Sequence, residues 1–156
     1  MTTFTANLVL VGTTLNDGTG DPLRTAFTRI NENFTSLSTL TKTITMVVGD
    51  ETTNITTGTG KYTMRMPQAL TLTEVRAGLT VAQAAGAAVI VDVNKMGTSI
   101  LSGKLTFTNA GNTTVGSGTP TVISDTVLPD NTVISVDIDQ VGTPLAKGLK
   151  VYLIGY

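Results

Sequence analysis

The sequence contains no cysteine, no histidine and no tryptophan, and it has only three tyrosines. The absence of cysteine excludes a disulfide framework, a thiolate nucleophile and a cysteine-ligated zinc or iron site. The absence of histidine removes the commonest general base and metal ligand of proteins. So few aromatic rings also weaken the case for sugar binding by stacking. Together these absences count against a catalytic chain.

Charged residues are scarce, at 13% of the chain against ~25% in an average soluble domain. The net charge is −1 and the basic residues form no cluster, which excludes the positive surface expected of a nucleic-acid-binding protein. Threonine makes up about a fifth of the residues. Such a polar but weakly charged surface is consistent with coverage by partner proteins, although threonine enrichment is also typical of β-structure.

Long apolar runs are absent as well. No stretch approaches the ~18 residues needed to span a bilayer, and residues 1–6 lack the basic and apolar regions of a secretory signal. We therefore expect no membrane partner, and synthesis in the cytoplasm without export by a signal peptide. At 156 residues the chain is long enough for one domain with a real core and an appendage.

The clearest local signal is a helix that follows a turn. Residues 16–21 combine asparagine, aspartate and two glycines, as tight turns do. Asp21 then predicts the N-cap, and Pro22 predicts the first helical position. The helical spacing of apolar residues continues to Leu37 and gives way to alternation after Thr39. The sequence therefore predicts a helix over 22–37 that ends near Thr39.

Apolar residues in this helix recur at alternating steps of four and three, which is the spacing of a coiled-coil seam. They are Leu23, Phe27, Ile30, Phe34 and Leu37. Isolated helices shorter than ~12–15 residues are marginal in water, and this one contains poor helix formers such as Thr25 and Thr28. We expect the five apolar residues to form an oligomer interface with another copy of the helix. The alternative is a lone amphipathic helix that packs on its own β domain.

The first 15 residues are rich in threonine and contain an apolar patch at 8–11 that ends at Gly12. This patch is compatible with a short strand or an extended arm. Because it precedes a helix that needs partners, we favour an arm that packs on a neighbouring subunit or a larger particle. The alternative is a frayed terminus.

From Ile44 onward, apolar residues alternate with polar ones as in half-buried antiparallel strands. The alternation changes parity between Leu72 and Val75, which predicts a bulge or turn near Thr73 and Glu74. Strands are expected at Ile44–Val48, Tyr62–Met66, Leu70–Leu72, Val75–Val81, Ala88–Asn94, Ile100–Leu101 running to Lys104–Thr108, Thr121–Ile123, Val133–Asp139 and Leu149–Ile154. The expected fold class is mainly β: an N-terminal arm and short α-helix over 1–41, then an antiparallel, jelly-roll-like β-sandwich over 42–156.

One pattern occurs twice, at 91–98 and 136–143: an acidic strand end followed by Gly-Thr. We interpret the two copies as strands that reach equivalent turns at one end of the sandwich.

Within the two copies, Asp92 with Asn94, and Asp137 with Asp139, each project to one face and offer oxygen ligands to a hard cation such as Ca²⁺. Both copies lack the further oxygens of an EF-hand loop. We therefore expect polar strand faces and no metal site.

Other candidate sites lack essential residues. The run 57–62 is similar to a phosphate-binding loop, but Ile55 replaces the first glycine and Tyr62 replaces the residue after the lysine, so a hairpin loop is expected. The remaining acidic residues form no pair that predicts acid–base catalysis. We expect no catalytic residue and no cofactor. A hydrolase ranks third, after a structural protein and a carbohydrate-recognition module.

Two segments carry a resemblance to phage proteins. The runs NDGTGDPLRTAF at 16–27 and RINENF at 29–34 resemble a segment near the N-termini of many tailed-bacteriophage virion proteins, among them tail fibre, head fibre, neck and decoration components. Residues 44–156 resemble a phage β-sandwich module in the phrases Arg65–Pro67, Val75–Ala77 and Ala146–Val151. The resemblance implies a non-enzymatic virion structural protein, commonly a homotrimer.

The implied partners are further copies of the chain and the major capsid protein or another virion protein, with localisation in the virion. A fibre that must reach a host needs a long shaft, and 156 residues do not supply one. A capsid-decorating protein, of the cement or knob type, is therefore favoured. The alternative is a tail-fibre or adaptor component whose β module binds a host-surface glycan.

Overall fold

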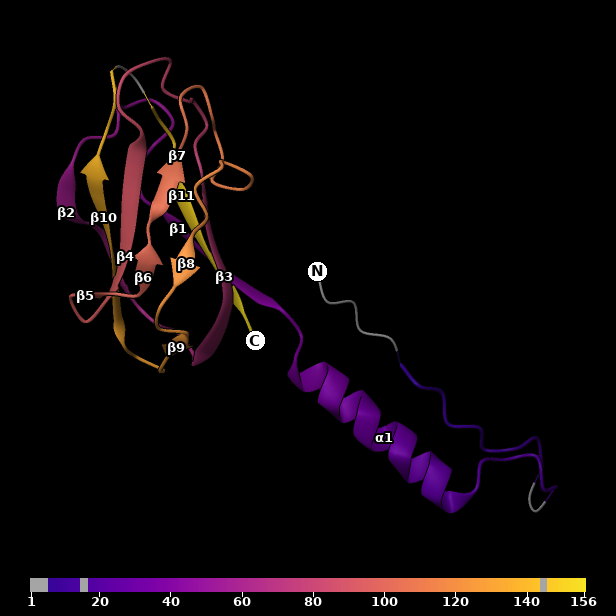
Figure 1. The fold of residues 1–156 in the computed structure, drawn as a ribbon. Coiled ribbons are helices and arrows are strands. Elements are labelled where there is room, and N and C mark those ends of the chain that lie inside the picture. Colours follow the sequence, from indigo (N-terminus) through magenta and orange to yellow (C-terminus); the bar gives the residue numbers. More distant parts are fainter. Residues whose placement is uncertain (1–5, 15–16, 144–145) are drawn as a thin grey trace. The chain divides into compact units, whose positions relative to one another are not determined.

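The structure is a computed structural model that describes residues 6–14, 17–143 and 146–156 (Figure 1). The chain divides into two compact units, residues 1–42 with residue 156, and residues 43–155. The predicted arm residues 1–5 and 15, and Asn16 of the predicted turn, lie outside the described residues.

The N-terminal unit consists of an extended segment, residues 6–14, that runs beside helix α1 (Leu23–Ser38) in the opposite direction (Figure 1). We call residues 6–14 the arm. The helix lies where the sequence predicts it, but its N-cap is Pro22, which makes no side-chain capping bond. The prediction of Asp21 as the N-cap was wrong, because its carboxylate accepts hydrogen bonds from the arm and from Arg29 instead.

The C-terminal unit is a sandwich of two antiparallel sheets. One sheet has the strand order β1 (Lys42–Val47), β11 (Lys150–Gly155), β3 (Leu70–Gly78) and β9 (Val127–Leu128). The other has the order β2 (Gly58–Arg65), β10 (Val133–Gln140), β4 (Val89–Lys95) and β5 (Thr98–Ser99), with β7 (Leu105–Phe107) also paired to β4. A separate pair joins β6 (Leu101–Gly103) to β8 (Val122–Ile123).

The strand order is that of a jelly roll. Leaving aside the short β5, β6 and β8, successive strands alternate between the two sheets, except that β4 and β7 are neighbours in one sheet. Two interlocked sheets of four strands connected in this way define the jelly-roll architecture. The predicted fold class, mainly β with one short helix before an antiparallel sandwich, is confirmed.

The predicted change of face within β3 is also present. Ile154 of β11 pairs with Glu74, and the next residue, Gly155, pairs with Leu72, so Thr73 is an extra residue in β3. This is a β-bulge, and it moves the buried positions from Leu72 to Val75. A Cβ atom on Gly155 would lie 2.1 Å from the carbonyl oxygen of Thr71. Glycine is therefore required where β11 passes the bulge.

The core lies between the sheets. On β4 the inward residues Val89, Val91 and Val93 are fully buried, and the facing sheet contributes residues such as Val151 and Leu153 from β11. Because side chains alternate along a strand, the intervening Asp92 and Asn94 lie on the outer face of their sheet.

The interpretation of the repeated pattern was wrong in one respect. The strands that carry it, β4 and β10, are antiparallel neighbours, with Lys95 opposite Ile134 and Ile90 opposite Gln140. The Gly-Thr turns that follow the two strands therefore lie at opposite ends of the sheet. Sequence similarity could not reveal strand direction, because the alternation of side chains is the same in both directions.

The run 57–62 is not a hairpin loop. It enters β2, which begins at Gly58 and pairs with β10 through an irregular register in which Val136 faces Tyr62 and Ile138 faces Gly58. In this irregular stretch the Gly60 N–H donates a hydrogen bond to Asp137 Oδ1 at 2.6 Å. The glycines thus shape a distorted strand start beside the acidic residues of β10.

Candidate functional site

The five residues predicted to form an oligomer interface lie exposed on α1. Their exposed fractions range from 36% for Ile30 to 73% for Leu23, and the helix has no buried residue. We call Leu23, Phe27, Ile30, Phe34 and Leu37 the seam. Exposed apolar patches of this kind mark interaction sites or aggregation-prone surfaces.

Polar side chains of α1 hold the arm by its backbone. Asn33 Oδ1 accepts from the Asn7 N–H at 2.6 Å, and Asn33 Nδ2 donates to the Asn7 carbonyl at 3.0 Å. Just before the helix, Asp21 repeats this pairing with Leu10: its N–H donates to the Leu10 carbonyl at 2.8 Å, and its Oδ2 accepts from the Leu10 N–H at 2.9 Å. The arm is therefore fixed at two points by paired hydrogen bonds.

Arg29 connects these two points. Its Nη1 donates to the Leu8 carbonyl at 2.6 Å and to Asp21 Oδ2 at 2.5 Å. Charge-assisted hydrogen bonds of this type are about twice as strong as neutral ones. Asp21, Arg29 and Asn33 thus bind the arm, a role that was not predicted from the sequence. One feature of the sequence could have indicated this role: Arg29 and Asn33 are four residues apart and therefore lie on the same face of the helix.

A compact loop joins the arm to the helix. Asp17 accepts hydrogen bonds from the Thr13 N–H and hydroxyl, the Thr14 N–H and the Thr19 N–H, at 2.6 to 2.9 Å. These bonds, with that of the Thr13 hydroxyl contributing most, hold the pKa of Asp17 well below its usual range. A Cβ atom on Gly20 would lie 3.1 Å from the Leu10 carbonyl oxygen, so glycine permits the close approach of arm and loop.

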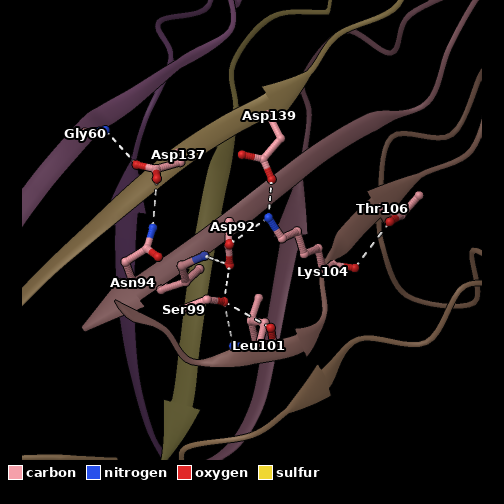
Figure 2. Close-up of polar contacts among 10 residues, drawn as sticks. Gly60, Asp92, Asn94, Ser99, Leu101, Lys104, Thr106, Asp137 and Asp139 are labelled. Carbon is pink, nitrogen blue, oxygen red and sulfur yellow. Dashed lines mark hydrogen bonds and ion pairs between the residues drawn. The ribbon is translucent and has the colours of Figure 1, made fainter. Parts of the chain in front are cut away.

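The acidic residues weighed as cation ligands come together on the outer face of the second sheet (Figure 2). Asp92 of β4 lies directly opposite Asp137 of β10, and like charges in such pairs repel. Lys104 fills the position that a cation would take: its Nζ lies 2.9 Å from Asp92 Oδ2 and 2.6 Å from Asp139 Oδ2. The role of this lysine was not predicted from the sequence.

Asp92 and Asp137 have further hydrogen-bond partners. Asp92 Oδ1 accepts from the Ser99 hydroxyl at 2.7 Å and from the Val93 N–H at 2.8 Å. Asp137 Oδ2 accepts from Asn94 Nδ2 at 3.0 Å. We call Asp92, Asn94, Ser99, Lys104, Asp137 and Asp139 the acidic network. Its hydrogen bonds, first that to Asp139 and then that to Asp92, raise the pKa of Lys104 to about 12.

This pKa fixes the pH range over which Lys104 stabilises the fold. Because the pKa is raised on folding, the stabilisation is fully present below the ordinary lysine value of 10.5 and is lost as the pH rises towards 12. At neutral pH the acidic network therefore carries its own cation.

We expect calcium to leave the melting temperature unchanged, because the Lys104 ammonium occupies the place between Asp92 and Asp139. A ligand stabilises the folded state by RT ln(1 + [L]/Kd), so an absent site contributes nothing. Thermal melts in excess Ca²⁺ and in chelator provide the measurement. A rise of several degrees with Ca²⁺, abolished in the double variant Asp137→Asn, Asp139→Asn, would show that the network holds an ion.

Within the described residues, no group of three or more aspartates and glutamates is arranged to hold a metal ion. In that same part of the chain, none of the helices has the length and apolar character needed to cross a membrane. No protein-family model matches this chain, and no curated protein or solved structure matches it either.

Proposed function

We propose that this chain is a non-enzymatic virion structural protein that forms a homotrimer and decorates the capsid as a cement or knob protein. The seam is the observation that carries the proposal. A helix of this length with no buried residue needs a partner to be stable, and its apolar residues have the spacing of a coiled coil. The resemblance of residues 16–34 to phage virion segments supports the trimer and the virion.

The proposed division of labour follows from the two units. The N-terminal unit joins the subunits and binds the major capsid protein or another virion protein. The jelly roll, with 22 buried apolar residues in one cluster, is the projecting knob.

The second candidate is a tail-fibre or adaptor component whose β module binds a host-surface glycan. One observation favours it: Arg76 of β3 lies directly opposite Tyr152 of β11, and both line a shallow depression of about 290 Å³ together with Thr43 and Ile154. Arginine and tyrosine are side chains that bind sugars well through hydrogen bonds and stacking.

Locating the protein in an electron-microscopy map of the virion tests the proposal, and we expect density on the capsid surface. Density confined to the tail would overturn capsid decoration in favour of the second candidate. A glycan array with the intact protein then separates the capsid-decorating protein from the glycan-binding tail component. For a capsid-decorating protein we expect no specific glycan binding. Specific micromolar hits that disappear in Tyr152→Ala, but persist in Tyr156→Ala, would support glycan recognition.

A further inference from the structure

The arm occupies one particular flank of the helix. The seam spacing places Phe27 and Phe34 at heptad position a, and Leu23, Ile30 and Leu37 at position d. Ala26 and Asn33 then fall at position g, and Arg29 at position c. These three residues are half-buried, and two of them bind the arm. The arm therefore lies beside the seam, on the g and c flank, and leaves the seam uncovered.

The opposite flank, positions b and e, is exposed and polar, but two of its threonines present methyl groups. Thr28 and Thr35, both at position b, are exposed, and each hydroxyl donates to the carbonyl four residues earlier, at 2.9 and 3.0 Å. Because these hydroxyls are satisfied within the helix, the methyl groups can be covered without leaving a polar group unpaired. Together with Asn31, Glu32 and Ser36 they line a depression of about 360 Å³.

The arm is bound by its backbone, and its apolar side chains remain exposed. Leu8, Leu10 and Val11 are 74%, 49% and 89% exposed, although the backbone groups of Leu8 and Leu10 are hydrogen-bonded to the helix and to Asp21. The binding side chains thus hold the backbone in place and present the leucine side chains outward.

Identical helices around one three-fold axis run parallel, and in parallel coiled coils the g flank of one helix faces the e flank of the next. We infer that each arm lies in the groove between its own helix and that of the neighbouring copy, with Leu8 covering the neighbour's Thr28 and Leu10 covering the start of the neighbour's helix. This inference rests on the proposed self-association and adds a second contact to it, formed by an arm and a neighbouring helix flank.

Cysteine cross-linking tests the contact in the intact protein. Asn7 is level with Asn33 and Leu10 with Asp21, which places Leu8 near the level of a neighbour's Thr28. In the double variant Leu8→Cys, Thr28→Cys, mild oxidation should give covalent trimers on a denaturing gel. The matched control Leu8→Cys, Thr25→Cys places the second thiol on the half-buried face that meets the chain's own arm, and it should give no covalent oligomer.

The outcomes separate this inference from the proposed function. A native trimer that yields only monomers after oxidation and denaturation would overturn the arm contact and leave the seam trimer standing. A parent protein that is monomeric in solution would overturn both. A native trimer that cross-links in the Thr28 variant and not in the Thr25 control supports both.

A second variant covers the case in which cysteine disturbs assembly. Leu8→Ser with Leu10→Ser keeps the arm backbone and its hydrogen bonds but removes the apolar contacts. We expect the dissociation constant of the oligomer to rise roughly tenfold to a hundredfold, and Leu8→Met with Leu10→Met to leave it within a few-fold of the parent. An unchanged dissociation constant in the serine variant would contradict the inference.

Discussion

Replacing Phe27 and Ile30 together by aspartate is expected to convert the oligomer to monomers while the β domain stays folded. Both residues lie in the centre of the seam and are exposed in the single chain, at 56% and 36%. Each large apolar side chain that becomes buried between helices contributes ~1.5–3 kcal/mol, and several unpaired carboxylates in the seam add a further cost. Light scattering gives the mass, and circular dichroism reports the β domain.

The matched control is Phe27→Leu with Ile30→Leu, which keeps the apolar seam and should keep the parent mass. If the aspartate variant also keeps the parent mass, the helix packs on its own β domain or the β-sandwich holds the oligomer. That result would remove the observation on which the proposed function depends.

Replacing Lys104 by methionine should produce the largest loss of stability among single changes in the acidic network. The substitution keeps the apolar stem but leaves Asp92, whose side chain is 7% exposed, without its cation and opposite Asp137. Breaking a fully buried pair in this way costs ~3–5 kcal/mol. Because Lys104 is 42% exposed, we expect about 2–3 kcal/mol at neutral pH, or a fall of roughly 8–12 °C in melting temperature.

Asp139→Asn is the control for this prediction. It removes the more exposed partner of Lys104 and retains the ion pair with Asp92, so the loss should stay below about 1 kcal/mol. Denaturant unfolding of the three proteins provides the measurement. Equal losses in Lys104→Met and Asp139→Asn would show that the buried Asp92 does not depend on the ammonium.

Most of the fold could be predicted from the periodic spacing of apolar side chains. The alternation from Ile44 onward identified the strands, and its change of parity located the bulge at Thr73. The four-and-three spacing located α1. These predictions succeed because burial of one face imposes a period of two on strands and of about 3.6 on helices. The two-residue strand β9 was missed, because Val127 and Leu128 are too short a run to show a period.

Hydrogen-bond partners were predicted less well. Asp21 has the residue type and position of an N-cap. Its Oδ2 instead accepts hydrogen bonds from the Leu10 N–H and from Arg29, so it does not cap the helix. Lys104 is an isolated lysine in the sequence, and only the pairing of β4 with both β7 and β10 brings it to Asp92 and Asp139. No local pattern marks such a residue, since its partners come from other strands.

By itself, then, the sequence determined the class of fold, the helix, its seam and the absence of cysteine and histidine chemistry, because each depends on residue type or on spacing within one element. The tertiary structure alone decided the strand order of the jelly roll, the antiparallel placement of the two acidic strands, the role of Lys104 as their cation and the binding of the arm by Asp21, Arg29 and Asn33. These features depend on which distant segments meet. Which segments meet depends on the packing of the whole sheet and on competition among polar groups for hydrogen-bond partners. Neither of these produces a periodic pattern in the sequence.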